Sequence, residues 1–265
     1  MSGLVTLSTK DKVSIFYGNN KYYFTMENLI KNKHLHEFKN IKIQAYSNME
    51  FNLVAIRLCD FLNPIIINND STIKIIAKDD FFAYIQSDEI NQCTDIDRMP
   101  YVVIQKDKRS WPQIKGNHEE VGTFSLIWLG KKSKSISREK WVRNISKIYV
   151  LKKNDNQISS AYKNLNLSAK KGQNVFIDNC SGCHSLDLKG QLNIGPDLNF
   201  PMNPLGYFSE KILKQFIRDP QSVRYYKNAK MEGFGKELLS DHDLDDLINF
   251  MKKINKQKKA SNETK

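Results

Sequence analysis

The chain has 265 residues, of which 40% are apolar and 26% charged, so it has the composition of a folded protein and is long enough for two domains. Its formal net charge of +12 is divided evenly, because residues 1–150 contain 22 basic and 16 acidic residues and residues 151–265 contain 19 and 13, which gives +6 for each part. Neither part is a dedicated basic domain, and we therefore expect no nucleic-acid partner.

The first 150 residues predict an α+β domain that consists mainly of strands. Two apolar runs at residues 13–17 and 22–25 flank a Gly-Asn-Asn turn at 18–20, a pattern typical of a β-hairpin. A short helix is expected at residues 26–32 and a helical turn at 58–62. Further strands are expected at residues 41–46, 52–56, 71–77, 101–105 and 124–129.

Basic residues also gather around Trp141 in this part of the chain. Such a cluster is either a solvated face or a docking site for an acidic redox partner. Its members are Lys131, Lys132, Lys134, Arg138, Lys140, Arg143 and Lys147.

A polar stretch between about residues 152 and 168 lacks an aromatic core pattern and is typical of a linker, with a boundary near residue 160. We therefore expect a first domain at residues 1–155, a linker at 156–167, a helical second domain at 168–256 and a disordered basic tail at 257–265.

Three helices are expected in the second domain. The first follows from apolar steps of three and four residues, the second starts at an N-capping serine and stops at a proline, and the third starts with a capping box. The residues that mark them are Ala169, Gly172, Phe176 and Cys180 for the first, Ser209 and Pro220 for the second, and Ser240, Asp243, Leu244, Leu247, Ile248, Met251 and Ile254 for the third.

The most specific signal in the chain is the run Cys180-Ser181-Gly182-Cys183-His184. Two cysteines separated by two residues can each bond one vinyl group of the same porphyrin, and the adjacent histidine then lies under the iron as an axial ligand. The cysteine pair by itself also suits a zinc half-site or a redox dithiol. The histidine favours one haem c, attached covalently through Cys180 and Cys183 and ligated by His184.

Four downstream residues are candidates for the sixth iron ligand. Met231 lies in an irregular, glycine-containing stretch between the second and third helices, where a loop can reach the far face of the ring, and we expect it to be the ligand. Met202 is close to two prolines, Met251 falls on the apolar face of the third helix and is expected in the core, and His242 is expected to be exposed in the first turn of that helix.

Several further features follow the haem motif in a fixed order. They are Gly195-Pro196-Asp197-Leu198, a helix that ends at Asp219-Pro220, Met231-Glu232-Gly233-Phe234, and Leu239-Ser240-Asp241. Together with the first helix they make residues 168–256 resemble a class I cytochrome c domain. The resemblance implies an all-α fold in which the first and last helices cross, near Gly172 and Phe176, and in which Pro196 supports the proximal histidine. Many members have proline after the ligand methionine, so Glu232 implies a less rigid loop here.

The N-terminal part is similar to the molybdopterin-binding domain of sulfite-oxidase-type proteins. The resemblance rests on the hairpin and on the runs at residues 58–62, 78–82, 111–112 and 124–128. That family uses a cysteine thiolate as a molybdenum ligand, whereas Cys59 has the setting of a buried structural thiol and Cys93 that of an exposed one. Whether the two form a disulfide is open at this point.

Several basic residues and histidines of this domain could in principle bind a cofactor. Lys106, Lys108 and Arg109 suit a pterin phosphate or a solvated loop, and we expect no molybdopterin. His34, His36 and His118 have no obvious carboxylate or thiol beside them and are expected to be surface histidines.

These features predict a mono-haem c-type cytochrome whose role is to carry single electrons, and they leave open whether it is also an enzyme. Its N-terminal, sulfite-oxidase-like module is expected to dock a redox protein partner. The alternative is a haem–molybdopterin oxidoreductase acting on a small oxyanion, and a third possibility is a haem that is structural or senses a small ligand.

The haem motif also implies a location. Attachment of haem to this motif takes place, by what the family implies, outside the bacterial inner membrane, so we expect a periplasmic protein. No run approaches the roughly 20 apolar residues of a membrane span, and residues 1–12 lack the apolar core of a secretory signal. We therefore expect that a signal peptide is missing from this sequence.

Overall fold

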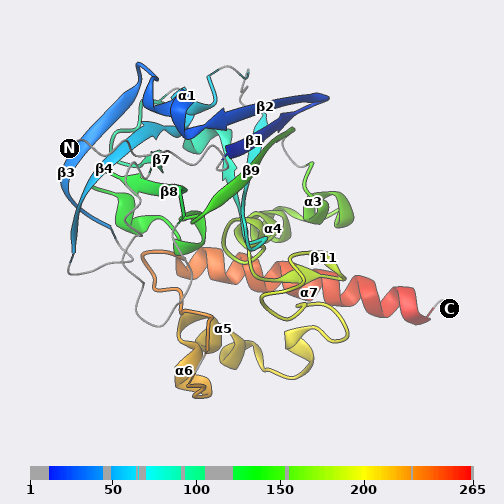
Figure 1. The fold of residues 1–265 in the computed structure, drawn as a ribbon. Coiled ribbons are helices and arrows are strands. Elements are labelled where there is room, and N and C mark those ends of the chain that lie inside the picture. Colours follow the sequence, from blue (N-terminus) through cyan, green and yellow to red (C-terminus); the bar gives the residue numbers. More distant parts are fainter. Residues whose placement is uncertain are drawn as a thin grey trace. The chain divides into compact units, whose positions relative to one another are not determined.

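The structure is a computed structural model that describes residues 12–43, 49–63, 65, 70–90, 93–104, 122–152, 155–227 and 229–263. The chain divides into two compact units, residues 1–153 and 154–265 (Figure 1). The first unit is built mainly of strands and the second mainly of helices. Three regions of the sequence discussed above, Lys106–Arg109, Trp111-Pro112 and His118, lie outside the described residues.

The first unit contains a five-stranded sheet in the order β2-β1-β9-β5-β6. The predicted hairpin forms its edge, with β1 antiparallel to β2, whereas β1 runs parallel to the last strand of the unit, β9. This pairing joins the start of the described chain to the end of the unit. The strands are β1 (Lys12–Tyr17), β2 (Asn20–Thr25), β5 (Ser71–Ala77), β6 (Phe82–Gln86) and β9 (Ile145–Lys152).

A four-stranded antiparallel sheet in the order β3-β4-β7-β8 completes the unit. The strand that was predicted at residues 41–46 is found earlier, because pairing of Leu35 with Ile56 extends it toward the N-terminus, and residues 44–48 lie outside the described part. The strands are β3 (Leu35–Lys42), β4 (Glu50–Arg57), β7 (Met99–Ile104) and β8 (Phe124–Leu129). Short helices are α1 (Met26–Ile30) and α2 (Leu58–Phe61), with 3-10 turns η1 (Ser87–Glu89), η3 (Ser133–Ser135) and η4 (Arg138–Lys140).

Strands β7 and β8 of the second sheet are buried on both faces, and successive side chains along each strand enter two different cores. On β7, Val102 and Ile104 join the main core, which also receives side chains of the five-stranded sheet, whereas Val103 joins a smaller cluster on the other face. On β8, Trp128 likewise joins the main core and Ile127 joins the smaller cluster. A period of two therefore explains why these strands are almost wholly apolar.

One member of the basic cluster is not part of a solvated face. Lys140 is 7% exposed, and its Nζ lies 2.6 Å from Oε1 of Glu89. The backbone carbonyl of Lys140 accepts a hydrogen bond from the indole of the buried Trp128. The expectation of a solvated position was wrong for Lys140, because a partner 51 residues away neutralises its charge inside the protein.

The second unit is a helical domain with one small hairpin. Its elements are α3 (Gln157–Ala161), α4 (Leu167–Asn179), β10 (Ser185–Leu186), β11 (Lys189–Gly190), η5 (Pro204–Gly206), α5 (Glu210–Arg218), α6 (Pro220–Val223) and α7 (Asp241–Glu263). The predicted caps are present, since the hydroxyl groups of Ser209 and Ser240 accept hydrogen bonds from the backbone N–H of Ile212 and Asp243.

Helices α4 and α7 cross at Gly172, as the resemblance implies. A Cβ atom at this position would lie 1.9 Å from the backbone carbonyl oxygen of Asp246, so only glycine permits the approach. Phe176 then reaches Phe250, with ring centroids 6.2 Å apart. The apolar stripe predicted for α7 is buried, from Leu244 to Ile254.

We expect Gly172→Ala to destabilise the second unit by about 3 kcal/mol, because the helices must separate to admit a methyl group. Urea unfolding checks this value. Gly206→Ala is the matched control, because there the added methyl would meet only the side chain of Met202, which can rotate away. Equal stability of the two variants would contradict the tight crossing.

Two predicted irregular segments are ordered parts of the second unit. Within the predicted linker at 156–167, Ile158 is 1% exposed and Tyr162 is buried, and the amide of the buried Gln173 donates to the carbonyls of both. The disordered tail predicted at 257–265 is wrong for residues 257–263, since α7 continues to Glu263, and residues 264 and 265 lie outside the described part. Gln173 satisfies the backbone of the first segment, and Lys258 of the second donates to the carbonyl of Pro201. Both contacts join residues that are distant in sequence, so local patterns do not predict them.

No described helix of the structure has the length and apolar character that crossing a membrane requires.

Candidate haem-binding site

The predicted haem motif begins where α4 ends. Backbone N–H groups of Cys180 and Ser181 donate to the carbonyl of Phe176, and those of Cys183 and His184 donate to the carbonyl of Cys180. The chain therefore makes one further tight turn that brings both cysteines and the histidine together. Both cysteines are half-buried, and neither belongs to a disulfide.

The imidazole of His184 is oriented by a single short contact. Its Nδ1 lies 2.7 Å from the carbonyl oxygen of Pro196, and because a carbonyl only accepts, Nδ1 carries the proton. Nε2 then keeps its lone pair for a metal ion. The support that the resemblance implied for Pro196 is thus present.

Burial favours the neutral form of the same imidazole. Burial lowers the pKa of His184, and the bond to the Pro196 carbonyl and the charge of Asp197 oppose that shift without cancelling it. Neutral imidazole is the form that ligates a metal.

Because Gly195 has no side chain, the imidazole of His184 can lie directly against its backbone. A Cβ atom at this position would lie 2.6 Å from Cε1 of His184 and 2.7 Å from its Nδ1. The backbone N–H of Gly195 also donates to the carbonyl of Cys183, at 2.7 Å. The loop therefore lies flat against the ring of the histidine.

The second unit exposes an unusual number of large apolar side chains close to the motif in sequence. Most of the large apolar residues that are exposed in the described chain fall between residues 188 and 226, although the unit is small. They are Leu188, Leu192, Ile194, Phe200, Met202, Tyr207, Tyr225 and Tyr226. A flat apolar group such as a porphyrin would cover surface of this kind, so the residues present fit a haem.

Met231 lies in a loop that is fixed to the end of α5. It is half-buried, and two residues later a Cβ atom on Gly233 would lie 2.2 Å from the carbonyl oxygen of Arg218. The guanidinium of Arg218 donates to the carbonyls of Phe234 and Leu239, and the N–H of Phe234 donates to Ile217 at 3.0 Å. These contacts restrain the loop although Glu232 stands where many cytochromes have proline.

The other candidates for the sixth ligand occupy different settings. Met251 is 4% exposed in the core of the unit, as its helical position predicts. His242 is largely exposed, with Nδ1 3.4 Å from Oδ2 of Asp246. Met202 is exposed beside Gly206.

This geometry agrees with the comparison of the sequence with known families. Residues 169–255 match the family model of cytochrome c. This segment is thus a cytochrome c domain, which supports a haem-binding electron carrier in general terms. The matched residues include Cys180, Cys183, His184 and Met231 and make up about a third of the chain. No curated protein matches the chain.

The cytochrome c domain contains a polar network to which the sequence pattern assigned no role. The carboxylate of Asp197 accepts hydrogen bonds from Ser185, Asp187, Leu188, Asn199 and Phe200. Burial by itself raises its pKa, but the bonds from Asn199, Leu188, Ser185 and Phe200 outweigh burial, and the pKa is lowered. The only available signal was the position of Asp197 directly after Pro196.

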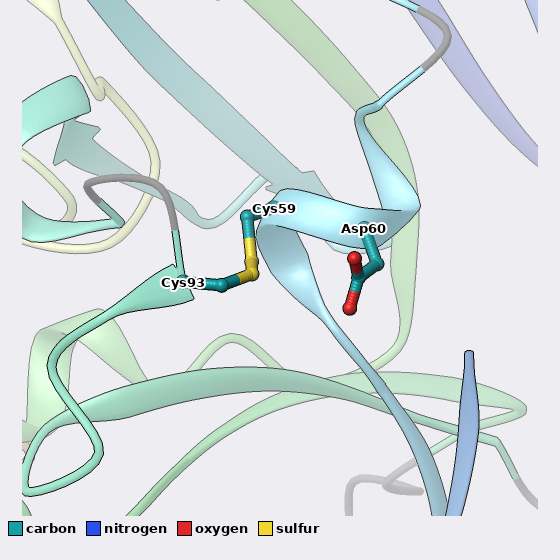
Figure 2. A group of neighbouring side chains, drawn as sticks. All are labelled: Cys59, Asp60 and Cys93. Carbon is teal, nitrogen blue, oxygen red and sulfur yellow. A yellow bond between two sulfur atoms is a disulfide. The ribbon is translucent and has the colours of Figure 1, made fainter.

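A second cluster of possible ligands lies in the first unit. Figure 2 shows a disulfide between Cys59, on α2, and Cys93, with Asp60 next to Cys59. Both cysteines are half-buried, so the expectation of a fully buried thiol at Cys59 was wrong. Disulfide sulfurs are not thiolate ligands, and the Asp60 carboxylate is already 2.5 Å from Nε of Arg57.

The histidines near this cluster are not simple surface residues. Nδ1 of His34 lies 3.6 Å from Oδ1 of Asp60, a carboxylate that the sequence order did not reveal. His36 is half-buried beside the rings of Phe38 and Tyr101, which also contact each other. Tertiary contacts with Asp60 of α2 and Tyr101 of β7 account for the two differences.

Removing the disulfide by Cys59→Ser and Cys93→Ser is expected to cost about 3 to 4 kcal/mol of stability, because it frees a loop of 34 residues in the unfolded chain. The midpoint of urea unfolding of the first unit measures this loss. Adding a reductant to the wild type should reproduce it. An unchanged midpoint in both experiments would show that the bond does not constrain the unfolded state.

Proposed function

We propose that the chain is a mono-haem c-type cytochrome that carries single electrons. One haem would be attached through Cys180 and Cys183, with His184 and Met231 as its axial ligands. The observation that supports this most directly is the 2.7 Å contact of Nδ1 of His184 with the Pro196 carbonyl, which leaves Nε2 for the iron directly beside both cysteines.

The bound haem would supply one-electron redox chemistry. The chain's own residues hold the ligands still during that reaction. Pro196 and Gly195 fix the ring of His184, and Arg218 and Gly233 fix the loop that carries Met231. A site whose ligands do not move favours electron transfer over binding of an external ligand.

The first unit is proposed to be a sulfite-oxidase-like module that docks the redox partner. Five of the basic residues around Trp141 have exposed side chains, which suits a partner of negative charge. They are Lys131, Lys132, Lys134, Arg138 and Lys147.

The disulfide bears on two parts of the proposal. It occupies both cysteines of the first unit, so a thiolate for molybdenum would first require its reduction, which supports the carrier over the haem–molybdopterin oxidoreductase. Disulfides also persist mainly in oxidising compartments, which supports a periplasmic location.

Metal analysis of the purified protein separates these functions. One iron and no molybdenum per chain is the result we expect. One molybdenum per chain would favour the oxidoreductase instead. An iron that exchanges external ligands readily would favour a sensor, and the reduced-minus-oxidised spectrum measures this.

A further inference from the structure

The carboxylate of Asp197 joins the two segments that hold the axial histidine. On one side it accepts from the hydroxyl of Ser185, at 2.8 Å, and Ser185 directly follows His184. On the other side it directly follows Pro196, whose carbonyl contacts the imidazole. A backbone hydrogen bond also connects the two segments, because the N–H of Leu198 donates to the carbonyl of Ser185 at 2.9 Å.

Asp197 also stabilises an unfavourable turn. Residues 187 and 188 join β10 to β11 with positive φ angles of 48° and 61°, although neither is glycine or asparagine. Such a conformation is unfavourable for Leu188, because its Cβ atom lies too close to the following carbonyl oxygen. The N–H groups of Asp187 and Leu188 both donate to the Asp197 carboxylate, at 3.1 and 2.7 Å, and these bonds offset the cost.

Residues outside the matched cytochrome c segment support this turn from two sides. The hydroxyl of Tyr162, which is 8% exposed, donates to Oδ2 of Asp187 at 2.6 Å. Nζ of Lys258 lies 3.7 Å from Oδ1 of the same carboxylate and donates to the carbonyl of Pro201 at 3.2 Å. Neither residue belongs to the segment that matches cytochrome c.

The carboxylate that orders the turn also places a negative charge next to the segments that hold His184. Strain that persists because its surroundings determine it is typical of functional sites. A fixed negative charge close to the axial imidazole stabilises the more positive, oxidised iron, and hydrogen bonding near the ligands is a recognised determinant of haem potential.

We propose that Asp197 is a positioning residue for His184, which holds the Pro196 carbonyl against Nδ1 and lowers the reduction potential of the haem. The inference rests on the proposed function, because it requires a haem ligated by His184. Tyr162 and Lys258 act through Asp187 to keep the turn in place.

The test is a potentiometric titration of haem-loaded Asp197→Asn, which removes the charge but keeps the shape. We expect the one-electron equilibrium to shift about tenfold toward reduced iron, a rise of about 59 mV in midpoint. Asp245→Asn is the matched control, because it removes one charge from an exposed position on α7 that contacts Lys214. The control should leave the midpoint unchanged. Equal midpoints for wild type and Asp197→Asn would overturn the proposal.

If Asp197→Asn does not retain haem, Ser185→Ala provides the test. It keeps the charge and removes a donor that partly neutralises it, so the midpoint should fall, and an unchanged midpoint would overturn the proposal. The proposed function fails separately, if the wild type itself carries no covalent haem or no iron–sulfur bond.

Discussion

Replacing Cys180 and Cys183 together by alanine is expected to abolish covalent haem attachment completely. In the proposed attachment each thiol would form one of the two bonds to the porphyrin, and no other cysteine of the chain is close to them in sequence. Extraction of the denatured protein with acidified organic solvent measures the result. All haem should leave the double variant, whereas the haem of the wild type should stay with the polypeptide.

The chain contains a matched control for this experiment. Cys59→Ser with Cys93→Ser also removes two cysteines, but from the disulfide of the other unit. This variant should keep its covalent haem. Loss of haem from the control, or retention by the alanine variant, would rule out attachment at the predicted motif.

Replacing Met231 by alanine is expected to remove the sulfur ligand of the iron. The weak absorbance band at the red end of the spectrum, which reports an iron–sulfur bond, should disappear. The midpoint should fall by on the order of 100 mV, because axial ligands set haem potentials over a range of about 0.8 V. The open position should then bind added imidazole.

Met202→Ala is the comparison for this variant. Met202 is also a methionine of the same domain and is exposed, so its loss should change neither the band nor the midpoint. If Met202→Ala loses the band and Met231→Ala keeps it, the ligand has been assigned to the wrong methionine.

Local patterns predicted those parts of the fold that short-range physics determines. The hairpin at Gly18, the caps at Ser209 and Ser240, and the apolar stripe of α7 all depend on residues within a few positions of each other, and the structure contains each of them. The haem motif belongs to the same class, because its five residues are consecutive.

Contacts between residues that are distant in the chain could not be predicted from the sequence. The segment at 157–162 is ordered by Gln173, the end of α7 is engaged through Lys258, and Lys140 is buried against Glu89. In each case a polar side chain that would be expected on the surface forms a hydrogen bond or an ion pair with a residue that is distant in sequence. The pairing of Cys59 with Cys93 is of the same kind, because proximity of two cysteines follows only from the complete fold.

Mass spectrometry of the tryptic peptide 172–189, which contains the whole motif between two lysine cleavage sites, tests the central claim most directly. We predict that the peptide carries the added mass of one haem and that neither of its cysteines reacts with an alkylating reagent. A peptide that lacks the added mass of haem and in which both cysteines are alkylated would contradict the account.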